Sequence, residues 1–181
     1  MTNSNELKTP YYLFDENVLR RHLAQMDDIR KKYTSDDLRF CYAIKANPFL
    51  IPYIDKFVEH FEVCSWGELK LCMQNAVAAD KIILSGVNKE PGMIADAVKY
   101  GVKIYTVESM NQYDEIVRQA EITNTHIRLL PRLSNGAQFG MDKSCIEEII
   151  QGNVKHPGIE IIGIHYFTGT QKRNSARLNQ N

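Results

Sequence analysis

The chain has 181 residues, with 22 lysines and arginines against 22 aspartates and glutamates, so its formal net charge is zero. Hydrophobic residues make up 44% of it and charged residues 24%, which excludes a disordered or collagen-like chain. The charge balance shows no basic stripe for nucleic acid, and no apolar run approaches the roughly 20 residues of a membrane-spanning helix. Four scattered cysteines without a C-x-x-C pair predict no metal site and indicate reduced thiols in a cytoplasmic protein (Cys41, Cys64, Cys72 and Cys145).

Short apolar runs alternate along the chain with amphipathic stretches. The runs are apolar throughout rather than alternating with polar residues, which is typical of strands covered on both faces of a parallel sheet. Strands are predicted over six of them: 38–43, 61–64, 81–84, 103–107, 125–130 and 158–165. Apolar residues at helical spacing predict helices over 17–32, 68–75 and 111–120. The alternation predicts βαβ units with right-handed crossovers.

Local start and stop signals agree with this order. Ser109 precedes a helical run as an N-cap, Pro91 suits a first helical turn, and Gly101 stands where a helix must end before the next strand. No linker rich in Gly, Ser or Pro divides the chain. We therefore expect one α/β domain over residues 1–181.

The number of units bears on the architecture. We count six strand–helix units, of which the last is cut off, with 171–181 predicted as a loop that enters a helix. A (β/α)8 barrel takes about 250 residues, so it would be incomplete here. An open doubly wound sheet could be complete at this length.

A lysine lies at the end of the first predicted strand, in Cys41-Tyr-Ala-Ile-Lys45-Ala-Asn-Pro48. The Ala-Asn-Pro sequence ends the strand, and the sites of α/β sheets and barrels form at the carboxyl ends of strands. A lysine amine between apolar walls at such a place suits Schiff-base chemistry. The alternative is a surface lysine at a strand end, and the spacing alone does not separate the two.

The second predicted strand carries Glu62, a carboxylate among apolar neighbours that requires a partner. Ser65 and Glu68 follow at the spacing of a capping box. A capping role explains these two residues as well as a role in a site does.

The sixth predicted strand runs into His165-Tyr-Phe167-Thr-Gly-Thr170. Its hydroxyls and glycine suit the close approach of a phosphate, and Phe167 can cover a flat heteroaromatic ring. The alternative is a polar turn, with His165 a buried imidazole that is satisfied by its neighbours. On the fifth strand, Arg128 and Arg132 indicate a bound anion or a cofactor oxygen, or else structural ion pairs.

In this order the segments resemble the fold-type III PLP-dependent decarboxylases, the family of diaminopimelate, ornithine and arginine decarboxylases. The family's Y-A-[VI]-K-A-N stands at 42–47, its D-x-x-S-x-x-E at 62–68 with Glu for Asp, and its G-x-H-x-H-x-G-S-Q at 163–171. The likeness runs from about Tyr11 to Gln171.

The resemblance implies that the cofactor is pyridoxal 5'-phosphate (PLP) and that Lys45 binds it covalently. Further implied cofactor contacts come from Glu62, Ser65, Arg132, His165, Phe167 and Thr170, the last in place of the Ser that contacts the phosphate. Phe167 replaces a His that stacks on the pyridine ring. An aromatic ring can still stack there, but it cannot titrate.

The fold that the resemblance implies is a (β/α)8 TIM barrel of the alanine-racemase-like type, truncated after about six βα units. The family's glycine-rich phosphate loop, its acidic partner for the pyridine nitrogen and its C-terminal β-domain would lie beyond residue 181. We therefore expect the N-terminal part of a homodimeric enzyme, inactive alone. The full enzyme would decarboxylate an amino acid such as diaminopimelate, ornithine or lysine.

Three alternatives stay open on the sequence. A PLP-dependent amino-acid racemase uses the same barrel and also begins with a lysine after the first strand. A non-catalytic PLP-binding or regulatory protein is favoured by the missing half. A class I aldolase also uses a barrel lysine, but the lysine here follows the first strand and the Thr168-Gly-Thr170 turn suits a phosphate cofactor, so the aldolase ranks last.

Overall fold

The computed structural model describes residues 8, 10–33, 38–136 and 138–169. The chain divides into two compact units, Met1–Arg39 and Phe40–Asn181. The first contains helix α1 (Glu16–Tyr33), which confirms the helix predicted over 17–32. The carboxylate of Asp15 accepts hydrogen bonds from the first backbone amides of this helix, and its last turn is basic, so both ends suit the helix dipole.

The second unit is built on parallel strands in the described residues. They are β1 (Cys41–Ala43), β2 (His60–Val63), β3 (Ile82–Leu84), β4 (Ile104–Val107), β5 (Ile127–Leu133), β6 (Ile159–Ile161) and β7 (His165–Tyr166). β1 to β6 are neighbours in sequence order, and β7 pairs with β5. A doubly wound sheet reverses its strand order at a switch point, whereas a barrel wall keeps it. The order is that of a barrel wall, as the TIM-barrel prediction requires.

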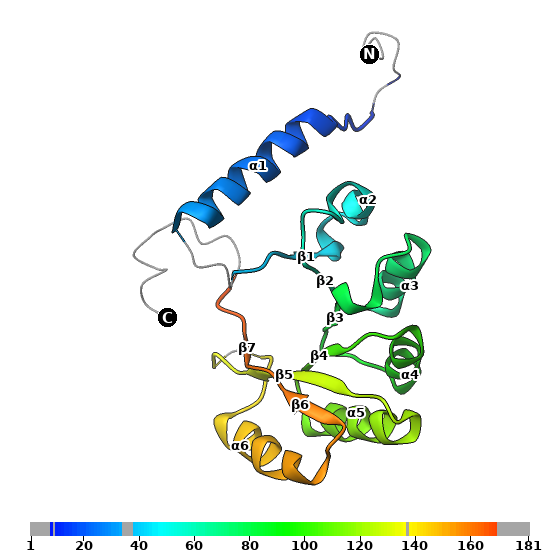
Figure 1. Cartoon of the computed structure of the whole chain (residues 1–181), viewed down its shortest axis with the longest axis vertical. Coiled ribbons are helices and arrows are strands. Elements are labelled where there is room, and N and C mark those ends of the chain that lie inside the picture. The colour runs from blue at the N-terminus through cyan, green and yellow to red at the C-terminus, as the bar shows by residue number, and fades with distance from the viewer. Residues whose placement is uncertain (1–7, 9, 34–37, 137, 170–181) are drawn as a thin grey trace. The chain divides into compact units, whose positions relative to one another are not determined.

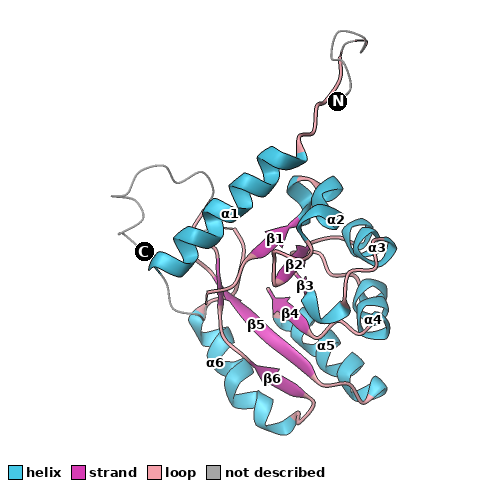
Figure 2. Cartoon of the chain, turned by 45° about the horizontal axis from the view of Figure 1, so that its top comes forward, coloured by secondary structure: helices cyan, strands magenta, loops and turns pink. Residues whose placement is uncertain are grey.

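Helices connect the strands and lie on the convex side of the arc that the strands describe (Figures 1 and 2). They are α2 (Ile51–Ile54), α3 (Trp66–Gln74), α4 (Pro91–Tyr100), α5 (Met110–Thr123) and α6 (Lys143–Gly152). The predicted signals hold: α4 begins at Pro91, Gly101 follows it with φ +103°, and the Ser109 hydroxyl accepts from the amide of Gln112 at 3.3 Å. α2 and α6 were not predicted: α2 has only four residues and contains a proline, and nothing in the structure explains why α6 was missed.

The core lies between the convex face of the sheet and the helices. Residues two apart on a strand share a face, and the fully buried pairs are Phe61 and Val63, Ile82 and Leu84, Tyr105 and Val107, and Ile127 and Leu129. The helices bury Leu69, Ile94, Ile116 and Ile149 against them. The intervening strand residues therefore face the concave side, where polar side chains are found.

The strand predicted over 158–165 is interrupted. β6 pairs with β5 in a register that sets Leu129 opposite Ile161, whereas β7 pairs with it in a register that sets Arg132 opposite His165. Paired residues of β5 and β6 differ by 32 in residue number, whereas those of β5 and β7 differ by 33. One extra residue is therefore inserted between β6 and β7, as in a β-bulge. Without it Ile164 would stand opposite Arg132. The insertion therefore turns His165 to the face that carries Arg132.

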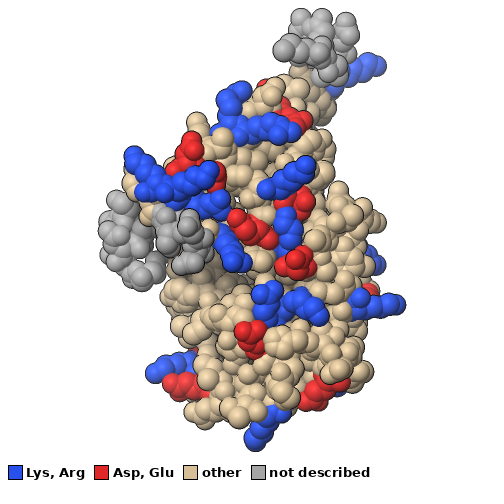
Figure 3. Space-filling view, viewed as in Figure 1, with Lys and Arg blue, Asp and Glu red and all other residues tan. Residues whose placement is uncertain are grey.

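Acidic and basic side chains are interspersed on the face of this unit that Figure 3 shows. Among the described residues, no helix has the length and apolar character needed to cross a membrane.

Candidate active site

A cavity of about 360 Å³ is lined by residues at the carboxyl ends of the strands. Among its lining residues are five of the predicted site residues: Lys45, Glu62, Arg132, His165 and Phe167. Ser65 lines a smaller neighbouring cavity of about 240 Å³, which shares Cys64 and Asn88 with the first. Thr170, together with the predicted loop and helix at 171–181, lies outside the described residues.

Lys45 is carried by a tight turn just after β1. This 3-10 turn spans Ile44–Ala46, and a second one begins at Pro48, where the side chain of Asn47 accepts a hydrogen bond from a backbone amide. The hydroxyl of Tyr42 donates to the Asn47 carbonyl at 3.1 Å and closes the turn. Lys45 itself is exposed, and its amine has no hydrogen bond or ion pair with another described residue.

Glu62 is the acidic side chain that β2 contributes to the cavity. It is half-buried, and its carboxylate too has no hydrogen bond or ion pair with the described residues. Cys64, two residues on, faces the same side, and burial raises the pKa of its thiol to about 11. At neutral pH this thiol is protonated and is not a nucleophile. Among the described residues that line the cavity, the charged groups without a hydrogen bond or ion pair are therefore one amine and one carboxylate.

Ser65 caps α3 as predicted, but Glu68 reaches the amide one residue before the cap rather than that of Ser65 itself, so the capping box is not complete. The Ser65 hydroxyl accepts from the Glu68 amide at 3.3 Å, and the Glu68 carboxylate accepts from the Cys64 amide at 2.7 Å. The capping interpretation accounts for both side chains. A cofactor contact from Ser65 stays a prediction.

Arg132 forms an ion pair with Glu108 at 2.7 Å, and their side chains are only 14% and 4% exposed. The guanidinium also lies over two aromatic rings, at 5.6 Å from the centroid of Phe139 and 5.7 Å from that of Phe167. Cation–π contacts of this kind add to the ion pair. Arg132 is therefore held in place, and its positive charge is balanced by the carboxylate of Glu108.

The loop after β5 brings Phe139 to this position. It folds back because the Ser134 amide donates to the Met141 carbonyl at 2.9 Å and the Met141 amide donates to the Arg132 carbonyl at 2.8 Å. The side-chain amide of Asn135 donates to the carbonyl of Phe167 at 3.0 Å, which ties the loop to the end of β7.

His165 is not the satisfied core histidine of the alternative reading. Its Nδ1 is buried and has no hydrogen-bond partner among the described residues. Burial lowers the pKa of the imidazole, and the charge of Arg132 lowers it further. His165 therefore brings a neutral ring to the cavity at pH 7.

Among the lining residues that sequence reasoning did not propose for the site are Ser85, Glu108 and Phe139. Ser85 and Glu108 directly follow β3 and β4, so the rule that sites form at the carboxyl ends of strands could have found them. No local signal marks Phe139, because a loop contact brings it into the cavity.

Lys89 lies buried beside the cavity and joins the loop after β3 to β4 and α5. Its amine donates to the Gly86 carbonyl at 2.6 Å, to Thr106 Oγ1 at 3.3 Å and to Gln112 Oε1 at 3.1 Å. Gln112 Oε1 also accepts from the amide of Glu108 at 3.1 Å. Lys89 thus positions the residue that pairs with Arg132.

The titration of Lys89 makes stability depend on pH. Burial lowers its pKa from 10.5 to about 8, against the opposing charge of Glu108. Because the unfolded chain keeps this proton to higher pH, stability rises between these two values. The native chain and a Lys89→Met variant are compared at each pH. Between pH 7 and 10.5, we expect the free energy of unfolding of the native chain to rise by about 3 kcal/mol more than that of the variant. Urea unfolding of both chains at a series of pH values measures this. Free energies of unfolding that change in parallel with pH in the two chains would contradict the prediction.

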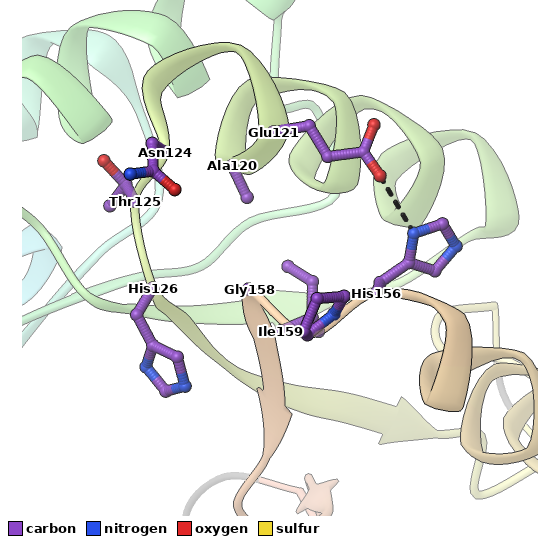
Figure 4. Close-up of a pocket in the computed structure, with 9 residues that line it drawn as sticks. Ala120, Glu121, Asn124, Thr125, His126, His156, Gly158 and Ile159 are labelled. Atoms are coloured by element: carbon purple, nitrogen blue, oxygen red, sulfur yellow. Dashed lines mark hydrogen bonds and ion pairs between the residues drawn. The ribbon is translucent and has the colours of Figure 1, made fainter.

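A second cavity, of about 490 Å³, lies at the opposite ends of β5 and β6 (Figure 4). There Glu121 Oε1 and His156 Nδ1 lie 3.0 Å apart in a hydrogen bond, and His126 and Gly158 line it where the strands begin. It is larger than the first cavity but contains none of the predicted site residues. In barrels the amino ends of strands contribute to stability rather than to catalysis. Among the described residues, no cluster of three or more metal-ligating side chains is found.

Comparisons with known proteins agree on one family. The model of the pyridoxal-binding domain of pyridoxal-dependent decarboxylases matches residues 19–181. An L-glutamyl-[BtrI acyl-carrier protein] decarboxylase of Niallia circulans is 29% identical over 190 residues, covering 95% of this chain and 43% of the relative. A diaminopimelate decarboxylase of Bacteroides thetaiotaomicron is 26% identical over 180 residues, covering 91% of this chain and 47% of the relative.

Solved structures share the fold. The crystal structure of a diaminopimelate decarboxylase from M. jannaschii has a TM-score of 0.84 at 18% identity, covering 97% of this chain and 45% of that one. The chain spans about half the length of the curated relatives that it matches.

Proposed function

The chain belongs to the pyridoxal-dependent decarboxylase family, in its pyridoxal-binding domain, and we propose that Lys45 holds PLP in the cavity at the carboxyl ends of the strands. The observation that carries this proposal is the Lys45 amine, which has no partner among the described residues and shares the cavity with Glu62 and His165. A nucleophilic amine left unengaged in a cavity is what attachment to an aldehyde requires.

The residues present fit this cofactor. The cavity volume of about 360 Å³ lies in the range of small-molecule sites. Two polar atoms at the cavity, Ser85 Oγ and His165 Nδ1, are buried without a hydrogen-bond partner among the described residues. Buried polar atoms are nearly always paired, so a polar ligand would satisfy both.

Bound PLP supplies an electron-accepting ring, which stabilises the negative charge left on an amino acid when its carboxylate departs as carbon dioxide. Lys45 holds the cofactor through Nζ. Glu62 balances the positive charge at that nitrogen, and the neutral His165 ring covers one side of the cavity. The Glu108–Arg132 pair and the two phenylalanine rings beside it line the cavity and hold each other in place.

For the whole protein we propose decarboxylation of an amino acid of the diaminopimelate, ornithine or lysine type by a cytoplasmic homodimer. The names of the relatives support decarboxylation, and they differ in substrate. The four cysteines are free thiols, as a reducing compartment would keep them. Release of carbon dioxide from one amino acid in a panel, without inversion at its α-carbon, would separate this activity from that of a racemase.

The first experiment uses the 181-residue chain. It is mixed with PLP, reduced with borohydride, digested and mapped by mass spectrometry. We expect one phosphopyridoxyl group per chain, on Lys45. Labelling spread over several lysines, or none at all, would contradict the proposal.

A further inference from the structure

Ser85 places a buried hydroxyl at the cavity that Lys45 also lines. The residue is only 2% exposed, and its Oγ has no hydrogen-bond partner among the described residues. It follows β3 directly and lines the same cavity as Lys45. Leaving a buried hydroxyl unpaired costs free energy, so its occurrence here calls for an explanation.

The neighbouring side chains do not supply the missing partner. Continuing the strand registers by one residue places Ser85 between Cys64 and Thr106 on the concave face. The Cys64 thiol is protonated and a weak hydrogen-bonding group. The hydroxyl of Thr106 already accepts from the amine of Lys89. Ser85 Oγ therefore remains available to the cavity.

The backbone holds this hydroxyl in place. The Ser85 amide donates to the Val63 carbonyl at 2.7 Å. Gly86 has φ +99°, and a Cβ there would stand 2.6 Å from the carbonyl oxygen of Cys64. Because the chain passes this close to β2, the end of β3 cannot shift to turn Ser85 away. The backbone position of Ser85 is therefore set before a ligand arrives.

Resting on the proposed function, we propose that Ser85 Oγ donates a hydrogen bond to the phenolic oxygen of the pyridoxal ring held by Lys45. That oxygen is on the ring carbon next to the one that bears the aldehyde, so it stays close to the lysine. Lys45 follows the end of β1 and Ser85 follows the end of β3, and these strands are two apart in the sheet, or roughly 10 Å between backbones. A lysine side chain and an aromatic ring together bridge such a gap.

Ser85→Ala tests this, because the loss of a ligand contact and the loss of a structural contact have opposite effects on the empty chain. Without a protein partner to lose, the variant should unfold at the same temperature as the native chain or higher. Its dissociation constant for PLP, measured by absorbance titration, should rise about fivefold, as expected for one neutral hydrogen bond. Ser144→Ala, at an exposed serine of α6, is the matched control and should change neither quantity.

A second titration uses pyridoxal, which lacks the phosphate. The same fold loss with both compounds supports a contact to the ring oxygen, whereas a loss with PLP alone assigns Ser85 to the phosphate and overturns the proposal. A Ser85→Ala chain that fails to fold, or melts lower when empty, would show a structural hydroxyl. If the variant binds PLP as tightly as the native chain, only the inference on Ser85 fails, because labelling of Lys45 still supports the proposed function. If the native chain is not labelled, both fail.

Discussion

The Lys45→Ala chain is expected to retain no borohydride-stable PLP, a loss of at least 100-fold in labelling relative to the native chain. Among the described residues that line the cavity, Lys45 is the lysine, and none of the others can form the covalent bond. Since its side chain is exposed and has no partner among the described residues, the free energy of unfolding should change by less than about 0.5 kcal/mol. Mass spectrometry of the reduced chain and urea unfolding measure the two quantities.

The matched control for this variant is Lys155→Ala, which removes another exposed lysine, in the short turn that follows α6. It should keep the full label on Lys45. A Lys45→Ala chain that is still labelled once per molecule at a single site would show that another lysine holds the cofactor. The assignment of the cavity would then be wrong.

Arg132→Met is expected to lower the free energy of unfolding by about 3 kcal/mol or more, the largest effect on stability that we predict. The variant keeps most of the apolar stem but leaves the carboxylate of Glu108, whose side chain is 4% exposed, without its partner. It also removes the cation–π contacts with Phe139 and Phe167. Urea unfolding at neutral pH measures the loss.

A double-mutant cycle identifies the cause of that loss. Glu108→Gln in the Arg132→Met background removes the unpaired charge and should recover most of the lost stability. Arg118→Met is the surface control: its ion pair with Glu115 has the same length, 2.7 Å, but Arg118 is 53% exposed, so the loss should stay below about 1 kcal/mol. A double variant as unstable as Arg132→Met alone would show that packing, rather than charge, dominates.

Local chemistry made much of the fold predictable. Apolar runs located β2 to β5 to within a few residues, and Pro91, Gly101 and Ser109 marked helix ends because caps and turns involve neighbours in the chain. Lys45 could be identified as a candidate because a strand end and its turn are also local.

The partner of each side chain was not predictable in this way. On the sequence, Arg132 could bind an anion or form an ion pair. The ion pair with Glu108, 24 residues away, forms at 2.7 Å because the ends of β4 and β5 are adjacent in the sheet. His165 faces the cavity because one inserted residue shifts the register between β6 and β7. A shift of one residue turns a side chain to the other face of a sheet. Such a shift cannot be predicted from the residue types of the segment.

By itself, then, the sequence determined the alternation of strands and helices, several of the places where they begin and end, and the lysine motif at 42–47, since each depends on interactions between close neighbours. Only the tertiary structure decided which charges pair, which buried hydroxyl has no partner among the described residues and which two rings lie beside Arg132. These depend on strand register and loop path, which are set by the packing of residues far apart in the chain.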